Sequence, residues 1–209
     1  YHSCFYKYAA NIPYICYMNL LIVAATKIEI TSNKLNQYPI LITGVGMVNT
    51  AIALTQELMK KKYDLVINMG VSGSFSDQLK NGDVVEVIED YFSEIGYEDA
   101  TNFCLFKEFD LKTKLIVKAK TKLKPVKAIT VNTVHGNKNS IQSTVNLFNP
   151  DIETMEGAAF FQVCNYFNVP CMQIRSISNR VEKRNKSNWD INLAIANLNM
   201  EVEKIIMSL

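Results

Sequence analysis

The chain has 209 residues, of which 48% are hydrophobic and 20% are charged, and its formal net charge is +2 at pH 7. This length suits one α/β domain that buries a large core. The near-neutral charge and the few Gly and Pro residues argue against an intrinsically disordered protein and against a nucleic-acid-binding protein.

Residues 1–17 are rich in aromatic side chains and lack the period of a strand or a helix. We interpret them as a non-native or misassigned N-terminal extension, with Met18 as the natural start. The alternative is a signal peptide with residues 12–25 as its apolar core, but Pro13 and Asn19 interrupt that run and cleavage there would remove the first strand. No other run approaches the ~20 apolar residues that span a bilayer, so we predict no membrane segment.

From residue 18 onward, apolar segments of strand length alternate with amphipathic segments of helical period. The predicted strands are 20–25, 38–43, 65–69, 83–89, 126–131, a segment between Pro150 and Glu156, and 169–177. The predicted helices are 47–62, 111–123, 139–148, the segment after Glu156, and 187–207. We expect strand 65–69 to stop at Gly70 and the turn Ser72-Gly73-Ser74. The alternation implies right-handed crossovers and a mostly parallel sheet in one domain, residues 18–209.

The Gly44-Val45-Gly46 turn before the first predicted helix has two interpretations. A dinucleotide-binding fingerprint needs G-x-G-x-x-G after the first strand and an acidic residue ~20 positions further on. Here Asn49 stands at the third glycine position, and the turn follows a later strand. We therefore predict a tight strand-to-helix turn.

The cysteines are odd in number and scattered along the chain. They are Cys4, Cys16, Cys104, Cys164 and Cys171. Because Cys164 and Cys171 have apolar neighbours, we expect buried free thiols in a reducing compartment. The two histidines, His2 and His135, leave no His-based metal site, and we predict neither a metal nor a cofactor.

Polar residues gather at the predicted carboxyl ends of the strands, where an open α/β sheet binds its ligands. They are Glu29, Ser72-Gly73-Ser74, Asn132, Thr133, His135, Gly136, Glu156, Ser178 and Asn179. This set has no Ser-His or Cys-His dyad, and no phosphate-binding P-loop occurs in the chain. Two carboxylates, an amide and backbone NH groups suit cleavage of a glycosidic bond, whose oxocarbenium-like transition state needs an activated water and a supported leaving group.

All three arginines of the chain, Arg175, Arg180 and Arg184, fall within one short stretch. A chance cluster on a solvated loop is one interpretation. We favour an anion site in or beside the pocket, because the guanidinium group binds anions bidentately.

Several segments resemble the purine nucleoside phosphorylase and nucleosidase superfamily. They are 21–26 with Glu29, 43–48, 66–75, 131–134, 155–159 and 175–195. From Met18 on, essentially the whole chain resembles the nucleosidase branch, and most closely the futalosine hydrolases, which act in an alternative route to menaquinone. The last stretch is the most specific. The resemblance implies a single-domain α/β fold of three layers, with a central mixed, mostly parallel sheet flanked by helices. It also implies a cofactor-free nucleosidase that is cytoplasmic and forms a homo-oligomer, a dimer or larger.

The resemblance further implies roles for the polar residues. Glu29 is expected to activate the hydrolytic water, and Glu156 to bind the ribose hydroxyls while Met155 packs on the sugar. Asn179 and Ser178 are expected to hold the purine and its N7 proton. The other expected substrate contacts are Ser72, Gly73, Val134 and Arg184. For Arg184, aided by Arg180, we expect a contact with the 5′ benzoate of futalosine, and the alternative is a solvated loop arginine.

Asn179 favours one class of base. Related nucleosidases that act on adenine nucleosides have an Asp at this position, whereas an Asn offers one donor and one acceptor. The donor matches the carbonyl of a 6-oxopurine, the acceptor can take the N7 proton, and a mismatched buried group costs about 1–3 kcal/mol. We therefore expect hypoxanthine rather than adenine as the base. The alternative is an Asn that only caps the loop.

The acceptor of the glycosyl group is expected to be water. Phosphorylases of the superfamily bind phosphate with a Gly-Asp-Pro-x-Arg-like turn after the first strand, and with a later Arg. Here the turn is Ala25-Thr26-Lys27-Ile28-Glu29, and no Arg precedes Arg175. A carboxylate repels phosphate even when Lys27 lies nearby, which favours hydrolysis over phosphorolysis.

Two features depart from the family pattern. His135 stands where the base-binding loop has a small residue, and the connection from Glu29 to Tyr38 is short. The alternative enzymes are a methylthioadenosine/S-adenosylhomocysteine nucleosidase or another purine nucleoside hydrolase or phosphorylase. A non-catalytic nucleoside-binding protein is the remote alternative, because binding alone does not need both Glu29 and Glu156.

Overall fold

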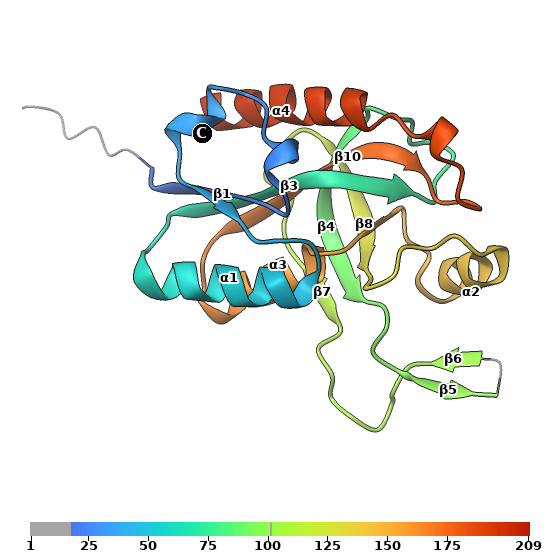
Figure 1. Ribbon diagram of the computed structural model, residues 1–209. Helices are drawn as coiled ribbons and strands as arrows, with labels where there is room; N and C mark the ends of the chain where they lie inside the picture. Colours follow the sequence, from blue (N-terminus) through green and yellow to red (C-terminus); the bar gives the residue numbers. More distant parts are fainter. Residues whose placement is uncertain (1–17, 101) are drawn as a thin grey trace, which may run out of the picture.

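The computed structural model describes residues 18–100 and 102–209. The predicted N-terminal extension, residues 1–17, lies outside this range together with Cys4, Cys16 and His2. The described residues form one eight-stranded sheet, a separate two-stranded hairpin and four α-helices (Figure 1).

The elements alternate along the chain much as predicted. The strands are β1 (Leu20–Ala24), β2 (Ile40–Ile42), β3 (Leu65–Ser74), β4 (Val84–Phe92), β5 (Tyr97–Asp99), β6 (Asn102–Cys104), β7 (Lys114–Ile116), β8 (Lys124–Thr130), β9 (Ile152–Thr154) and β10 (Cys171–Arg180). The helices are α1 (Met47–Lys60), α2 (Lys138–Phe148), α3 (Gly157–Tyr166) and α4 (Ile191–Met207). Three short 3₁₀ helices are η1 (Lys27–Glu29), η2 (Leu35–Gln37) and η3 (Lys186–Asn188).

The large sheet is mixed and mostly parallel. Its strand order is β10-β4-β8-β9-β3-β1-β2, with β7 beside β4. Because β10 also pairs with β3, the strands β3, β10, β4, β8 and β9 close into a circuit. Strand β1 is parallel to β2 and β3, β10 to β3, and β8 to β4 and β9. The antiparallel pairs are β10 with β4, β3 with β9, and β4 with β7.

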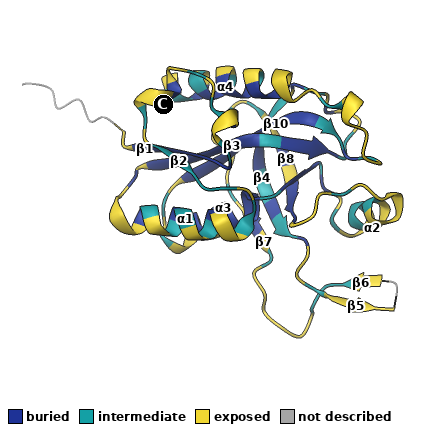
Figure 2. Ribbon diagram, in the orientation of Figure 1, coloured by how far each residue is buried: buried dark blue, intermediate teal, exposed yellow. Residues whose placement is uncertain are grey.

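Helices cover both faces of the sheet, with α1 and α3 on one side and α4 on the other (Figure 1). Leu21 and Val23 of β1 belong to the apolar cluster that includes side chains of α1 and α3. Leu20 and Ile22 belong to the second cluster, which includes side chains of α4. A strand covered on both faces has no polar alternation, which explains its continuous apolar run. The predicted three-layer α/β fold is confirmed, and Figure 2 shows the buried residues concentrated in the sheet between the helices.

The predicted helix over residues 111–123 is wrong. This segment contains the short strand β7, which pairs antiparallel with β4, and Leu115 is buried while its neighbours are exposed. The following loop is held by the Glu86 carboxylate, which accepts hydrogen bonds from the backbone N–H groups of Lys120 (2.8 Å) and Thr121 (2.9 Å). These partners are distant in sequence, so the local spacing of apolar residues could not indicate them.

Strand β3 does not stop at residue 69 as predicted. It continues to Ser74, and Ser72-Gly73-Ser74 is strand rather than turn. Strand β10 runs parallel to its second half as far as Arg180, and β9 pairs with its last two residues. Backbone pairing with these two strands overrides the turn propensity of the Gly and Ser residues.

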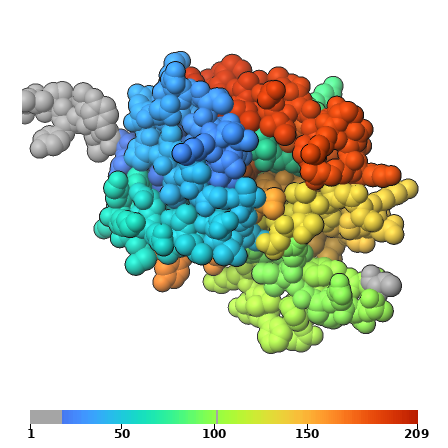
Figure 3. Space-filling view, viewed as in Figure 1, coloured from blue at the N-terminus to red at the C-terminus, as the bar shows by residue number. Residues whose placement is uncertain are grey.

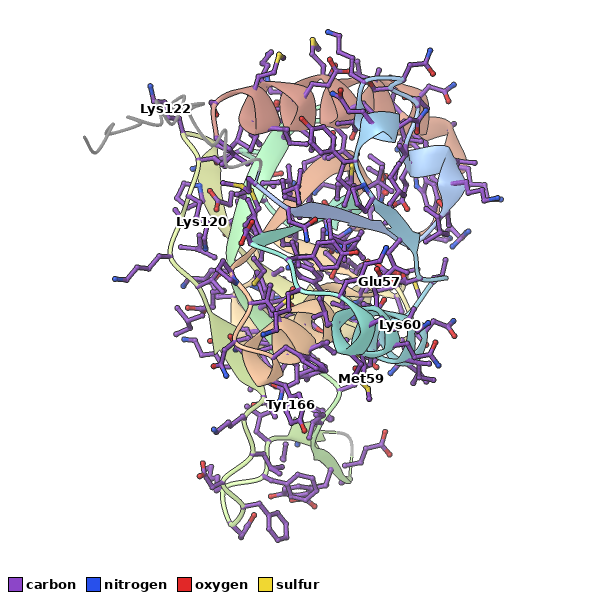
Figure 4. The ribbon with its side chains drawn as sticks, turned by 90° about the vertical axis from the view of Figure 1, so that its left-hand side faces the viewer. Glu57, Met59, Lys60, Lys120, Lys122 and Tyr166 are labelled. Carbon is purple, nitrogen blue, oxygen red and sulfur yellow. The ribbon has the colours of Figure 1, made fainter. Side chains whose placement is uncertain are left out.

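The chain ends in helix α4, which begins at Ile191, later than the predicted residue 187. Asp190 caps it by accepting a hydrogen bond from the backbone N–H of Leu193 at 3.0 Å. The β5–β6 hairpin extends from the body and is largely exposed (Figures 1 and 2). Met59 of α1 and Tyr166 of α3 are exposed as well, on the outer side of the helical layer (Figure 4). Within the described residues no helix has the length and apolar character needed to cross a membrane.

Candidate active site

A cavity of about 360 Å³ lies where β1, β3, β9 and β10 end. This volume lies in the range that accommodates small molecules. All the residues expected to act in catalysis or to contact the substrate line it, namely Glu29, Ser72, Gly73, Val134, Met155, Glu156, Ser178, Asn179 and Arg184. Of the other polar residues expected at the strand ends, Ser74, Asn132 and Thr133 do not line it. In Figure 3 the segments that contribute to its wall, coloured blue, yellow and red, border one another on the same face of the molecule.

Glu29 reaches this cavity although its connection to the next strand is short. The residue ends η1, directly after β1, and its side chain is buried. Its Oε2 atom accepts hydrogen bonds from the backbone N–H and the hydroxyl of Thr26, at 2.9 and 3.1 Å. Its Oε1 atom accepts one from the backbone N–H of Val71 at 3.3 Å. Three donors from two segments thus fix the carboxylate at the cavity wall, whereas Lys27 is exposed and does not line the cavity.

Glu156 occupies the turn between β9 and α3, also with a buried side chain. Its Oε1 atom accepts a hydrogen bond from the backbone N–H of Gly46 at 3.0 Å. Gly46 has a φ of 97°, a conformation that glycine adopts without strain. The prediction of a tight turn at Gly44-Val45-Gly46 is confirmed, and the turn has a role that the sequence did not indicate, since it holds a cavity carboxylate.

Arg175 is not on a solvated loop, so that interpretation is wrong for this residue. It lies within β10 with 1% of its surface exposed, and its guanidinium is 4.0 Å from the Glu156 carboxylate. Its Nε donates to Gln173 Oε1 at 2.9 Å, and its Nη2 donates to Asn68 Oδ1. Arg175 is therefore a buried counter-charge behind Glu156.

This buried polar network extends to Asp90 in β4. Gln173 Nε2 donates to Asp90 Oδ2 at 3.0 Å, and the Thr130 hydroxyl donates to Oδ1 at 2.8 Å. Complete burial raises the pKa of Asp90 to about 6, although these hydrogen bonds and the charge of Arg175 act in the opposite direction. Sequence reasoning missed this support, since Asp90 and Gln173 lie inside strands rather than at their ends.

Ser178 and Asn179 lie together near the end of β10. The Ser178 hydroxyl is within hydrogen-bonding distance of Asn179 Oδ1 (2.8 Å) and of the backbone carbonyl of Ser72 (3.2 Å). Asn179 Nδ2 donates to the backbone carbonyl of Arg180 at 2.9 Å. The amide therefore keeps one hydrogen-bonding position at each of Oδ1 and Nδ2. Among the described residues, the buried Ser72 hydroxyl has no hydrogen-bond partner.

Sequence reasoning missed Glu153, a buried carboxylate of β9 that also lines the cavity. It accepts a hydrogen bond from the backbone N–H of His135 at 3.1 Å, and the ring Nδ1 of His135 is 2.6 Å from its Oε2. The His135 that departs from the family pattern thus has a specific partner. A charged residue between two core residues, Ile152 and Thr154, was the available sequence signal.

The remaining two arginines have separate environments at the cavity rim. Arg184 lies over the Trp189 ring, 5.0 Å from its centroid, and Arg180 forms an ion pair with Asp77 at 2.6 Å. Each of the three arginines therefore has its own partners. In residues 18–100 and 102–209, no three His, Cys, Asp or Glu side chains are arranged to hold a metal ion. Cys164 and Cys171 are buried free thiols there, as predicted.

Comparison with known proteins identifies the class to which this fold and cavity belong. The profile of the Phosphorylase superfamily matches residues 11–208. A 5′-methylthioadenosine/S-adenosylhomocysteine nucleosidase of Shewanella halifaxensis is 31% identical, with 78% of each chain covered. One of Desulfotalea psychrophila is 32% identical over 67% of this chain and 65% of the relative. The chain belongs to the phosphorylase superfamily, as an enzyme of its nucleosidase group.

Solved structures share the same fold at lower identity. A futalosine hydrolase mutant of Helicobacter pylori has a TM-score of 0.79 and 18% identity, covering 92% of this chain and 100% of that one. A 5′-methylthioadenosine/S-adenosylhomocysteine nucleosidase of Neisseria meningitidis in complex with methylthio-immucillin-A has a TM-score of 0.76 and 19% identity, covering 91% and 99%. At these identities the likeness concerns the fold, and the substrate must be argued from the cavity.

Proposed function

We propose that this enzyme hydrolyses the N-glycosidic bond of futalosine, releasing hypoxanthine and dehypoxanthine futalosine in the futalosine route of menaquinone biosynthesis. The observation that carries the proposal is the convergence of Glu29, Glu156 and Asn179 on one cavity. Glycosidic cleavage needs groups for the water, for the sugar that becomes positively charged, and for the leaving base. These three residues supply one group for each need.

Glu29 is the proposed general base. Its carboxylate is held by Thr26 and Val71 at the cavity wall, and its Oε1 accepts only one of the three hydrogen bonds. A water bound there donates a proton to Glu29 while its oxygen attacks C1′ of the ribose. The nearby negative charge disfavours phosphate as the acceptor, and this supports hydrolysis over phosphorolysis.

Glu156 is the proposed ribose-binding group, with Met155 packed on the sugar. The Gly46 N–H occupies one side of its carboxylate, and the remaining acceptor sites suit two vicinal hydroxyls. The negative charge also stabilises the positive charge that develops on the ring in the transition state. Arg175 lies behind this carboxylate, at 4.0 Å, as its buried counter-charge.

Asn179 is the proposed reader of the base. As the C1′–N9 bond breaks, its electron pair passes to the purine, and N7 takes up a proton from solvent water. The free position at Oδ1 accepts this N7–H, and the free position at Nδ2 donates to O6 of hypoxanthine. The backbone carbonyl of Arg180, which can only accept, holds Nδ2 on its side and so fixes the orientation of the amide. Ser72, Gly73 and Val134 complete this part of the wall.

The 5′ substituent is proposed to lie near Arg184. This side chain stacks on Trp189 at the cavity rim, and no ion pair engages it among the described residues. A guanidinium can bind the benzoate of futalosine through two parallel hydrogen bonds. Arg180 is a weaker candidate for this contact, since Asp77 already neutralises it.

Cleavage of methylthioadenosine or S-adenosylhomocysteine is the second candidate function. Two observations favour it: the curated relatives carry that name, and the rim includes the apolar side chains of Ile28, Val45 and Ile191, which suit an alkylthio group. Asn179 argues against it, because its Nδ2 donor would oppose the exocyclic amine of adenine.

We also propose a homo-oligomer. Val48, Ile52 and Met59 are exposed along α1, and the exposed Val45 and Ile28 continue this apolar surface to the cavity rim. Contiguous exposed apolar surface of this kind marks protein–protein contacts. Light scattering is expected to give a dimer or a larger assembly, and a monomer at micromolar concentration would contradict the proposal. A cytoplasmic location remains a prediction.

One assay tests the proposed function. The purified enzyme is incubated with futalosine, inosine and methylthioadenosine, with and without phosphate, and the released base is separated by chromatography. We expect hypoxanthine from futalosine at a rate that does not depend on phosphate. Adenine release alone would establish the second candidate, and a strict phosphate requirement would establish a phosphorylase. Substrate binding without release of base would indicate a non-catalytic binding protein.

A further inference from the structure

The proposed reaction leaves one buried carboxylate of the cavity without a role. Glu153 lies in β9 between Ile152 and Thr154, which face the core. Because side chains alternate along a strand, Glu153 points the other way, into the cavity wall, where 5% of its surface is exposed. Burying a carboxylate costs free energy, so a carboxylate in this position needs hydrogen-bond donors to offset that cost.

His135 supplies the donors that this chain provides. The His135 backbone N–H donates to Oε1 at 3.1 Å, and the ring Nδ1 lies 2.6 Å from Oε2. The Thr144 hydroxyl is 2.9 Å from the other ring nitrogen and can donate to it, which leaves the proton on Nδ1, facing Glu153. Within the described residues no Lys or Arg forms an ion pair with Glu153. Its carboxylate is therefore oriented and still has acceptor capacity for a ligand donor.

Glu153 and Asn179 lie side by side around one glycine. Gly73 pairs with Glu153 across the antiparallel β3–β9 ladder. A Cβ atom placed on Gly73 would lie 3.5 Å from Cγ of Glu153 and 3.3 Å from Nδ2 of Asn179. The absence of a side chain at this position therefore brings the carboxylate and the amide to the same end of the cavity.

The edge of a 6-oxopurine matches this pair. Along that edge N7 and O6 are followed by N1, which carries a hydrogen in hypoxanthine. Adenine has an unprotonated N1 with a lone pair, which a carboxylate repels. We propose that Glu153 is a specificity-determining residue that accepts the N1–H of a 6-oxopurine, beside Asn179, which contacts O6 and N7. This role rests on the proposed function and extends it, because it makes base selection depend on two side chains.

His135 is a positioning residue in this arrangement. It contacts Glu153 through both its backbone and its ring, and the Phe75 ring lies against it with a centroid separation of 5.9 Å. A small residue at position 135 could supply the backbone N–H but not the second hydrogen bond. The departure of His135 from the family pattern is thereby explained as the partner of Glu153.

The test measures binding of three free bases to the full-length enzyme by calorimetry: hypoxanthine, 1-methylhypoxanthine and adenine. The methylated base keeps O6 and N7 but lacks the N1–H, so it isolates the contact assigned to Glu153 from those of Asn179. Wild-type enzyme is expected to bind hypoxanthine at least about tenfold more tightly than either other base. Glu153→Ala is expected to lose affinity for hypoxanthine and to gain affinity for 1-methylhypoxanthine, because the shortened side chain makes room for the methyl group.

Two further variants separate the loss of the Glu153 contact from a general loss of structure. Glu153→Gln preserves volume and can donate to N1 or accept from it, so the preference for hypoxanthine over adenine should shrink to a few-fold. Glu182→Gln is the matched control, since this carboxylate also lines the cavity but bonds to Asn188 at 2.8 Å, and its base preference should equal that of wild type. Thermal unfolding of each variant verifies that it is folded.

The outcomes separate the two proposals. If wild type prefers hypoxanthine and folded Glu153→Ala keeps the same ratio of hypoxanthine to 1-methylhypoxanthine affinity, the role of Glu153 is overturned while the proposed function stands. If wild type binds adenine at least as well as hypoxanthine, the proposed function fails and the role of Glu153 fails with it. A structural role alone would lower all three affinities together and would not produce a gain for the methylated base.

Discussion

The two ends of the cavity are built differently. At the sugar end, Glu29 and Glu156 are held largely by backbone N–H groups, from Thr26, Val71 and Gly46, and Glu156 has the buried Arg175 behind it. At the base end, pairs of side chains contribute as well, since Ser178 bonds to Asn179 Oδ1 and the ring of His135 lies 2.6 Å from Glu153 Oε2. Backbone donors cannot be changed by substitution, whereas side-chain partners can. The sugar end is therefore suited to a fixed reaction, and the base end is where specificity can change.

The largest expected effect is at the sugar end. Glu29→Gln should leave substrate binding nearly unchanged, because the amide keeps the size of the side chain. It should lower turnover on the order of 10²–10⁴-fold, as removal of a positioned general base does. Single-turnover rates and substrate affinity measured on the same preparation check this. Near-normal turnover would show that another group activates the water.

Glu156→Gln should slow the chemical step more than it weakens binding, by on the order of 10²-fold, because the negative charge acts mainly on the transition state. Rates on the parent nucleoside are compared with those on its 2′,3′-dideoxy analogue. If the analogue is cleaved as fast as the parent by wild type, Glu156 does not act through the ribose hydroxyls.

The buried polar network behind Glu156, which includes Asp90, should make the free energy of unfolding depend on pH. Burial raises the pKa of Asp90 to about 6 in the folded state, above its ordinary value of 3.8. Between these two values the folded state binds more protons than the unfolded state, so the contribution of Asp90 to stability falls as pH rises and becomes constant at about pH 7. Asp90→Asn removes this titration.

The expected size follows from the shift of roughly two units, on the order of 3 kcal/mol between pH 4 and pH 7. The free energy of unfolding by urea is measured for wild type and Asp90→Asn across this range. The difference, wild type minus variant, should decrease with rising pH. A constant difference would mean that Asp90 has the same pKa in both states.

At the base end, Asn179→Asp should weaken action on the 6-oxopurine nucleoside and admit adenine analogues, because the donor facing O6 becomes an acceptor. A mismatch of about 1–3 kcal/mol corresponds to roughly 5-fold to 150-fold in the ratio of kcat/KM values. Competition between inosine and adenosine measures this ratio directly. An unchanged preference would assign base reading to Glu153 or another group alone.

The smallest expected effect is at the rim, where solvent screens charges. Arg184→Ala should raise KM for futalosine about threefold to tenfold and hardly change KM for its methyl ester. Arg180→Ala is the matched control, because Asp77 already pairs with Arg180, and it should leave both values unchanged. Equal effects of Arg184→Ala on acid and ester would exclude a contact with the carboxylate.

Particular elements illustrate how far local pattern could predict this fold. Strand β1 was predictable because both its faces are covered, so every residue of Leu20–Ala24 is apolar. The segment around Leu115 was mistaken for a helix, since its strand pairing with β4 and its contacts with Glu86 come from elsewhere in the chain. Strand β3 continues beyond its predicted end at Gly70, because β10 and β9 pair with the residues that follow.

The residues of the candidate site also fall into those that the sequence could predict and those that it could not. Glu29, Glu156 and Asn179 could be proposed from sequence, because each stands near the predicted end of a strand. A polar side chain at such a position does not have to pack in the apolar core, so it is free to serve a ligand. Glu153 and Asp90 could not, because each lies within a strand and only the tertiary contacts reveal its polar partners.

The sequence by itself determined the α/β class, the order of most elements and the chemical groups available for the reaction, since these follow from local period and residue type. Only the tertiary structure decided which groups meet. The N–H of Gly46 reaches Glu156 across 110 positions, and Gly73 leaves room for Glu153 beside Asn179. The physical reason is that hydrogen bonds and close packing act over a few ångströms in space, whatever the separation along the chain.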